Sequence, residues 1–215
     1  MLKQQSIEAY LSDLASRSPT PGGGAAAAIT GAQGVALLAM VCNLTLGKEK
    51  FSPVGPEVRT ILEKLEKHRS TMLDLAQQDV DVFQAVRAAY QRPKAMPDDL
   101  ESRKEVIQAS LKAASEVPCQ LVGVCAEALS LTSIVRKIGN PSVLSDVTVG
   151  EHLLVAALLS ADANVEANLV SIDDVAFCQS KRSFVSKVRK DLNLSAPSYS
   201  ARPSVRADRP PAPAP

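Results

Sequence analysis

Apolar residues recur every three or four positions along most of this chain, and stretches rich in proline, glycine and serine interrupt the pattern. Such spacing puts apolar side chains on one helix face, and the interruptions mark helix ends. The pattern predicts helices over residues 4–16, 24–46, 56–90, 98–138, 142–170 (or 145–170) and 174–191. The expected fold class is all-α, a single-domain up-and-down bundle of about six helices.

Two of these predicted helices have unusual interiors. Pro118 lies within the fourth and should kink it, because proline removes one backbone hydrogen bond and crowds the preceding turn. Between Leu153 and Ala161 the fifth is apolar almost all round, which is typical of a buried central helix.

The composition agrees with a helical protein that has one substantial core. The chain has 215 residues, of which 46% are hydrophobic and only 3% aromatic, a balance that favours close helix packing over a β-sandwich. We expect residues 1–194 to form the helical domain. Residues 195–215 are rich in proline, serine, alanine and arginine and predict a disordered tail, because they cannot bury enough apolar surface to fold.

The charge pattern argues against nucleic acid and membrane as partners. The 24 basic residues nearly equal the 23 acidic ones, so the chain has no strong positive field. Residues 19–47 contain no charged side chain and are long enough to span a bilayer. Their alanines, glycines and polar residues make them only weakly hydrophobic, and we find no second candidate in the chain. They are therefore predicted to form a central helix of a soluble bundle.

The spacing of the cysteines and histidines argues against a metal site. His68 and His152 are far apart in sequence, and no two cysteines form a C-x-x-C pair. Each cysteine lies in an apolar helical context, where a free thiol behaves as a small hydrophobe, and this favours a reducing cytoplasm. The four are Cys42, Cys119, Cys125 and Cys178.

A run of three glycines, Gly22, Gly23 and Gly24, opens directly onto the alanine-rich second predicted helix. Glycines can turn successive N–H groups inward as a nest, and the helix dipole points its positive end at the same place. The run therefore predicts an anion-binding loop. A flexible loop that caps a buried helix is the other interpretation.

Asp79 falls in the apolar stripe of the third predicted helix, whereas Asp74 and Asp81 project to the opposite side. At about 100° per residue, the stripe contains Ile61, Leu65, Met72, Ala76, Phe83, Val86 and Tyr90. A buried carboxylate needs a cation or hydrogen-bond donor, which a neighbouring element could supply in a purely structural role. Alternatively, Asp79 faces a ligand cleft with a shifted pKa. Tyr90 on the same face favours this second interpretation.

Asn164 and Asn168 are one turn apart on the fifth predicted helix, on the side of Leu153 and Ala157. Three acidic residues lie on the other side of this helix, namely Glu151, Asp162 and Glu166. Buried asparagines usually satisfy one another or a neighbouring helix end, so a structural role is the simpler interpretation of the pair.

Four stretches taken together resemble the cyclodeaminase/cyclohydrolase family of folate one-carbon enzymes. They are Pro21–Ala27 with Met40–Lys48, Asp79–Lys94, Ala114–Pro118, and Gly139–Pro141 with Ser145–Val147. The resemblance extends in the right order over about residues 4–190. It implies a homodimeric helical fold and chemistry on the N5–N10 bridge of tetrahydrofolate. The expected activity is methenyltetrahydrofolate cyclohydrolase or formimidoyltetrahydrofolate cyclodeaminase, with a folate as substrate and no cofactor.

The resemblance also implies roles for individual residues. Asp79 matches the catalytic aspartate, an acid/base or electrostatic residue. The remaining residues would bind substrate: the three glycines with their amides, Lys48 and Lys94 through the folate carboxylates, and Ser145 and Asp146 as parts of the cleft wall. Tyr90 would supply a hydroxyl or a stacking ring.

Two positions depart from the family pattern. Ala25 stands where serine is common, and Glu166 stands where the family often has arginine. These changes favour a rival hypothesis, in which the protein is a helical dimer that binds folate or another protein without turnover.

Overall fold

The computed structural model describes residues 1–92 and 98–195 of the chain. This part contains helices joined by short turns and loops, and it has no strand. In chain order the elements are η1 (Leu2–Gln4), α1 (Ile7–Leu14), α2 (Gly23–Thr45), η2 (Glu49–Val54), α3 (Gly55–Tyr90), α4 (Asp98–Ile138), η3 (Pro141–Val143), α5 (Leu144–Leu169) and α6 (Val175–Asp191), where η denotes a short 3-10 helix. The predicted tail, residues 195–215, lies outside the described residues apart from Ser195.

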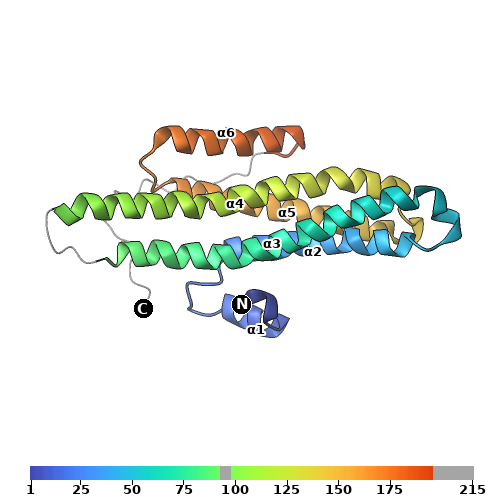
Figure 1. Ribbon diagram of the computed structural model, residues 1–215, viewed down its shortest axis with the longest axis horizontal. Helices are drawn as coiled ribbons and strands as arrows, with labels where there is room; N and C mark the ends of the chain where they lie inside the picture. Colours follow the sequence, from blue (N-terminus) through green and yellow to red (C-terminus); the bar gives the residue numbers. More distant parts are fainter. Residues whose placement is uncertain (93–97, 196–215) are drawn as a thin grey trace.

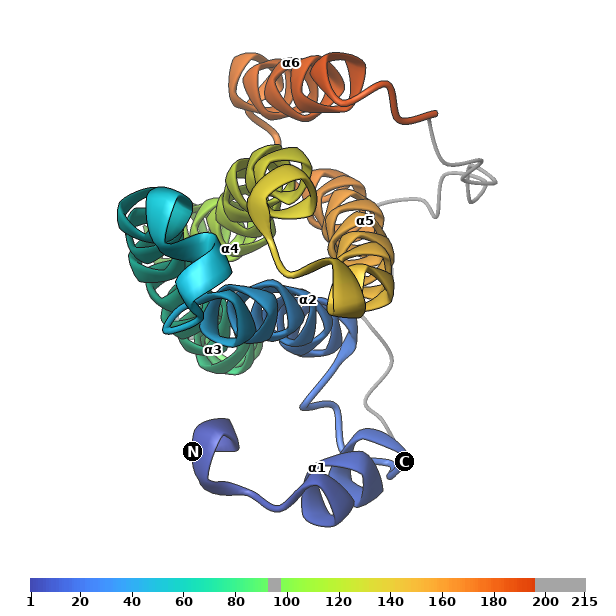
Figure 2. The same ribbon diagram turned by 90° about the vertical axis from the view of Figure 1, so that its right-hand side faces the viewer.

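Helices α2, α3, α4 and α5 lie alongside one another and enclose the core (Figures 1 and 2). Their inward faces bury large aliphatic side chains, among them Leu38, Leu65, Met72, Leu75, Leu154 and Leu158. Helix α6 lies outside α4 and α5, and α1 stands apart from the bundle beyond α2 (Figure 2). The predicted all-α, single-domain architecture is confirmed.

The predicted helix ends agree with the observed ones except in the first helix. Residues 4–16 do not form one helix, because Gln5 is extended and Ser6 caps a shorter α1 by accepting a hydrogen bond from the Ala9 N–H at 3.1 Å. None of the α1 residues is fully buried: Tyr10 and Leu14 are half-buried, and Ile7 and Leu11 are exposed. Pro118 lies inside α4, and the helix continues past it to Ile138, as predicted.

Two glycines allow α2 and α5 to touch through their backbones. A Cβ atom added at Gly34 would lie 2.7 Å from the carbonyl oxygen of Gly150, and one added at Gly150 would lie 2.9 Å from that of Gly34. Such distances are shorter than real Cβ contacts, so both positions must lack a side chain. This contact sets the spacing between α2 and α5.

Polar side chains join the last turn of α2 to the beginning of α5. Thr45 and Asn140 are both buried. The Asn140 N–H donates to the Thr45 hydroxyl at 2.9 Å, and its side-chain amide donates to the Leu44 carbonyl at 3.2 Å. Because their polar atoms are used in this way, Thr45 and Asn140 have a structural role.

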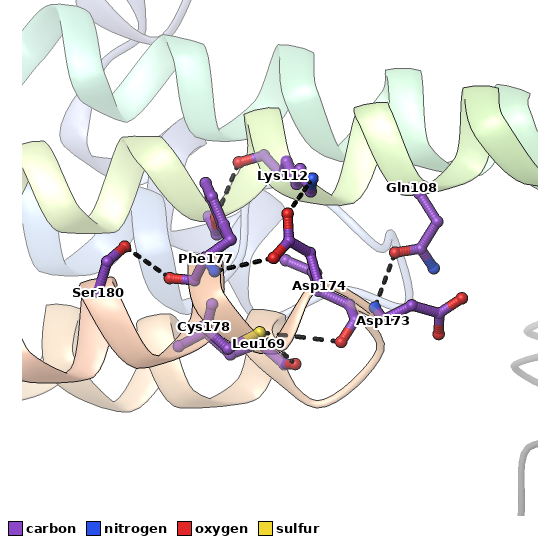
Figure 3. A network of polar contacts seen from close by, with 10 residues as sticks. Gln108, Lys112, Leu169, Asp173, Asp174, Phe177, Cys178 and Ser180 are labelled. Carbon is purple, nitrogen blue, oxygen red and sulfur yellow. Dashed lines mark hydrogen bonds and ion pairs between the residues drawn. The ribbon is translucent and has the colours of Figure 1, made fainter.

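Helix α6 is attached mainly through polar and charged contacts. Figure 3 shows the α5–α6 turn, where Gln108 of α4 accepts from the Asp173 N–H and Lys112 contacts Asp174, which also caps α6. Further along, Arg189 pairs with the buried Asp162 at 3.1 Å. Only Cys178 and Val185 of α6 are buried.

Helix α5 is open on one side, so the prediction of a helix buried all round is wrong. Ala156 and Ser160 are exposed, and so is Val149. By length and composition alone, Gly23–Thr45, Leu100–Ile138 and Pro141–Leu169 could each cross a membrane, so the expectation of a single candidate is also wrong. The bundle buries 61% and 56% of the apolar window in the first two but only 28% in the third.

Replacing Gly34 with alanine should destabilise the fold. The new Cβ would meet the Gly150 carbonyl at 2.7 Å, and backbone cannot move aside as a side chain can. We expect a loss of about 1–3 kcal/mol in the free energy of unfolding, measured in urea. Gly55→Ala is the control, because a Cβ there meets nothing within 4 Å; it should be neutral or stabilising. Equal stability of the two variants would contradict the proposed backbone contact.

Candidate active site

Helix α2 begins part-way along the bundle, and its N-terminal end is therefore open. Asp79 of α3 lies beside this end, and α3 continues for eleven more residues to Tyr90, about 16 Å further. Figure 1 shows α3 and α4 reaching beyond the beginning of α2. The first N–H groups of a helix have no acceptor within it, so this end presents free donors and a positive dipole.

The Asp79 carboxylate is held at this helix end. Its Oδ2 accepts a hydrogen bond from the backbone N–H of Ala25 at 3.0 Å. Gly22, the N-cap residue of α2, has no side chain that could cap the helix. Asp79 therefore supplies from α3 the acceptor that a capping residue normally supplies locally.

Gly24 makes room for this carboxylate. A Cβ added at Gly24 would lie 2.0 Å from Oδ1 of Asp79, inside any possible contact distance. The predicted glycine nest is wrong, because Gly22 is extended and Gly23 and Gly24 are the first helical residues. Gly47 is the one glycine with a positive φ in residues 1–92 and 98–195. The glycines therefore permit close approach and do not provide a left-handed turn.

Two opposing effects act on the Asp79 carboxyl group. Burial disfavours its charged form and raises the pKa, and the hydrogen bond from the Ala25 N–H favours the charged form and lowers it. Burial is the larger effect, so the pKa of Asp79 lies above its ordinary value. The group is thus suited to release and recover a proton closer to neutral pH than an exposed aspartate.

Other side chains surround the open end of α2. Asn164 of α5 lies next to Gly23, since a Cβ added there would be 3.6 Å from the Asn164 Oδ1. Its amide nitrogen donates to the Ser160 carbonyl at 2.8 Å. Phe83, one turn beyond Asp79, is 43% exposed, and Tyr90 is half-buried. This surface combines an acid, an amide and aromatic rings.

The sequence did not identify Asn164 as a site residue. Its position on the inner side of the fifth predicted helix was the one feature that pointed to the site. Asn168 has the structural role expected of it, because its amide donates to the Ala114 carbonyl at 3.0 Å. Asp162, grouped with Glu151 and Glu166 on the other side, is buried against Arg189.

Not all predicted site residues lie near Asp79. Lys48 follows the last turn of α2, and Ser145 and Asp146 lie in the first turn of α5, beside that same end. Since α2 has 23 residues, these three residues are about 34 Å from Gly23 within one chain. Lys94 lies outside the described residues. One chain thus brings together the three glycines and Asp79, whereas Tyr90 lies about 16 Å further along α3.

The two departures noted in the sequence have clear places in the structure. Glu166 faces α6, and both its carboxylate oxygens accept from Arg182 Nε at 3.0–3.1 Å. Its negative charge therefore serves an interhelix ion pair. The Ala25 side chain is fully buried, and its N–H makes the contact with Asp79. Neither departure removes the carboxylate or the helix end that holds it.

Comparison with known proteins places this geometry in a family. The sequence profile of the formiminotransferase-cyclodeaminase family matches residues 6–187. The chain belongs to this family. A methenyltetrahydrofolate cyclohydrolase of Methylorubrum extorquens is 43% identical over 84% of this chain and 87% of its own length.

Other members of the formiminotransferase-cyclodeaminase family are similar over most of the chain. The formimidoyltransferase-cyclodeaminase of Gallus gallus is 30% identical over 86% of this chain, which spans only 34% of that longer protein. The crystal structure of formiminotetrahydrofolate cyclodeaminase from Thermotoga maritima superposes with a TM-score of 0.81 at 28% identity, covering 90% of this chain and 92% of the other. The fold around Asp79 is thus a fold of this family.

The Asp79→Asn substitution should remove a pH dependence of stability. The native state binds a proton at Asp79 more tightly than the unfolded chain does, so its stability falls as pH rises from the ordinary aspartate pKa through the raised one. Asparagine keeps an acceptor for Ala25 without the buried charge. The free energy of unfolding of the variant, measured by urea titration, should therefore increase relative to that of the native protein as pH rises through this range. A constant difference at every pH would contradict the raised pKa.

Gly24 and Asp79 should be strongly coupled. Gly24→Ala forces the carboxylate away from Ala25, but the same change should cost little in an Asp79→Ala background, where nothing fills that space. A double-mutant cycle should give a coupling free energy of about 0.5–3 kcal/mol. Gly22→Ala is the control, since its Cβ would be 3.9 Å from the Pro19 carbonyl. Additive effects of Gly24→Ala and Asp79→Ala would show that the two residues do not share this contact.

Proposed function

We propose that this protein is a folate one-carbon enzyme that acts on the N5–N10 bridge of tetrahydrofolate. The observation that carries the proposal is the Asp79 carboxylate at the open end of α2, in a chain 43% identical to a methenyltetrahydrofolate cyclohydrolase over most of both lengths. Its main reaction is then hydrolysis of 5,10-methenyltetrahydrofolate to 10-formyltetrahydrofolate.

The geometry at Asp79 suits this reaction. The methenyl carbon carries positive charge, which a fixed carboxylate next to it stabilises. Water adds to that carbon and loses one proton to Asp79, which passes it to N5 as the bond between the carbon and N5 breaks. The hydroxyl of the adduct releases its remaining proton to solvent as the formyl C=O forms. A pKa raised by burial lets one carboxyl group both take up and return the proton. The exposed ring of Phe83 offers an apolar surface for the flat pterin.

The second candidate is cyclisation of 5-formimidoyltetrahydrofolate to the methenyl compound with loss of ammonia. Its support is the close likeness of the fold to a formiminotetrahydrofolate cyclodeaminase. Both reactions pass through a tetrahedral adduct at the same carbon, so the same carboxylate serves either. Acid/base chemistry of this kind needs no cofactor and no metal.

We also propose that the protein works as a homodimer in the cytoplasm. The uncovered apolar side of α5 supports the assembly. The four buried free cysteines fit a reducing compartment.

The proposed function is tested by adding purified protein to each folate separately and following the methenyl chromophore. The native protein should accelerate its loss from 5,10-methenyltetrahydrofolate above the spontaneous rate. Asp79→Asn should lower kcat by about 10²–10⁴-fold, the usual contribution of an acid/base group. Asp81→Asn, an exposed carboxylate on the same helix, should leave kcat unchanged.

Three results would count against this proposal. Gain of chromophore from 5-formimidoyltetrahydrofolate without hydrolysis of the methenyl compound would favour the second candidate. Full activity of Asp79→Asn would remove the carboxylate from the mechanism. No change with either folate would favour the rival hypothesis of a folate-binding or protein-binding module.

A further inference from the structure

A pocket lies at the end of the bundle where α4 ends and α5 begins. It has a volume of about 430 Å³ and is bounded by η2, the end of α4 and the first residue of α5. Figures 1 and 2 show these segments at one end of the molecule. We call it the end pocket.

The end pocket is separate from the candidate active site. Gly139 in its wall packs on Val41 of α2, since a Cβ added at Gly139 would be 2.9 Å from Cγ1 of Val41. Val41 is about 25 Å along α2 from Gly24. A ligand in the end pocket is therefore remote from Asp79, which lies against Gly24.

Three cationic side chains from two segments line the end pocket: Lys50 of η2, and Arg136 and Lys137 of the last turn of α4. None of the described residues that line it is acidic. Arg136 is already engaged, since its guanidinium donates to Glu151 at 2.6 Å and to Thr148 at 2.9 Å. Lys50 and Lys137 make no ion pair within the described part of the chain. Two lysine charges at this pocket thus have no carboxylate partner.

The dipole of α4 accounts for only part of this charge. Cations are favoured at the C-terminal end of a helix, where Lys137 lies. Lys50 belongs to another element, and its Nζ lies 4.6 Å from the centre of the Phe51 ring, which also lines the pocket. Two separate segments therefore bring a free ammonium group to the same pocket, and an aromatic ring lies beside one of them.

The beginning of α5 adds to the positive field. Leu144, the first residue of α5, lines the pocket, and no side chain caps this helix. The acidic residue of its first turn, Asp146, is not part of the lining. The positive end of the α5 dipole therefore acts on the pocket together with the two lysines.

The walls of the end pocket are held in place without a ligand. The Gly139 N–H donates to the Val135 carbonyl at 2.8 Å, and the buried Asn140 next to it is hydrogen-bonded to the last turn of α2. Pro53 and Pro141 also line the pocket, and their rings fix the local backbone. A ligand that binds here therefore orders little of the chain, which lowers the entropic cost of binding.

We propose that the end pocket binds a small phosphate monoester. Two ammonium groups act as point charges, and this suits a phosphate because its oxygens can be reached from several directions. A planar carboxylate is best recognised by a free arginine fork, whereas the fork of Arg136 is occupied by Glu151 and Thr148.

The size of the end pocket fits an ester better than a free phosphate ion. Its volume lies in the range of about 300–1,000 Å³ that is typical of sites for small organic ligands. The Phe51 ring offers an apolar surface for the organic group of the ester. This binding is independent of the reaction proposed at Asp79.

Binding is measured by calorimetry with phenyl phosphate at constant ionic strength, because salt screens exposed charges. The native protein should bind it saturably, at one site per chain. Lys50→Gln and Lys137→Gln should each raise Kd about 10-fold, as loss of a hydrogen bond from a charged group does. Lys187→Gln makes the same change at an exposed lysine of α6 and should leave Kd unchanged. Asp79→Asn should also leave it unchanged, because that carboxylate does not line the pocket.

Three results of the calorimetry would overturn the proposed site. The first is absence of saturable binding, or equal affinity of the native protein and both lysine variants. The second is loss of binding in Asp79→Asn, which would place the ligand at the candidate active site. The third is tighter binding of phthalate, an aromatic dicarboxylate, than of phenyl phosphate, which would contradict the preference for phosphate.

Chemical labelling locates the site directly. Pyridoxal 5′-phosphate is a phosphate monoester whose aldehyde forms an imine with a lysine amine and releases water, and borohydride then reduces the imine to a stable amine. Peptide mapping should find the label on Lys50 or Lys137 in excess over Lys187, and added phenyl phosphate should abolish this excess. Equal labelling of the three lysines, no protection by phenyl phosphate, or the same preference with pyridoxal, which lacks the phosphate, would overturn the proposed site.

Discussion

The contact between the Asp79 carboxylate and the first turn of α2 is the interaction on which the site depends. It joins two helices at a point where one of them begins, so the same contact caps α2 and holds an acid at this helix end. A local capping side chain at Gly22 would have stabilised the helix equally well. Taking the acceptor from α3 instead leaves the carboxylate half-buried, with a raised pKa, which costs stability and supplies a proton carrier.

Glycine and alanine make this arrangement possible in two ways. At Gly24 the absence of a side chain gives the carboxylate its place, and at Gly34 and Gly150 it lets two helices meet through their backbones. In both cases the absence of a side chain lets two groups come closer than a Cβ atom would allow. The charged residues are used for a different purpose, since α6 and the α5–α6 turn are held to the bundle by ion pairs with Asp162, Glu166 and Lys112.

The helices and the position of Asp79 on α3 could be predicted from the sequence, because both depend on the spacing of apolar residues. The helix wheel placed Asp79 in the apolar stripe of α3, and that is where it lies. Its partner could not be predicted, because which helix end meets which side chain depends on tertiary packing. The same limit explains Lys48, Ser145 and Asp146: motifs can be assigned to a common site, but the length of α2 separates these residues from Asp79 in one chain. The open side of α5 was mistaken for a core face because apolar residues on an exposed helix side have the same sequence pattern as buried ones.

The starting point of α2 has a consequence for the size of the ligand. Helices α3 and α4 continue past this point, so the beginning of α2 sets how much of their length beyond Asp79 has no α2 beside it. Each extra turn at the beginning of α2 would cover about 5.4 Å of that length. The position at which α2 begins therefore limits the length of a ligand beside Asp79. A relative whose α2 begins one turn earlier or later would accept a ligand of different length on an otherwise unchanged scaffold.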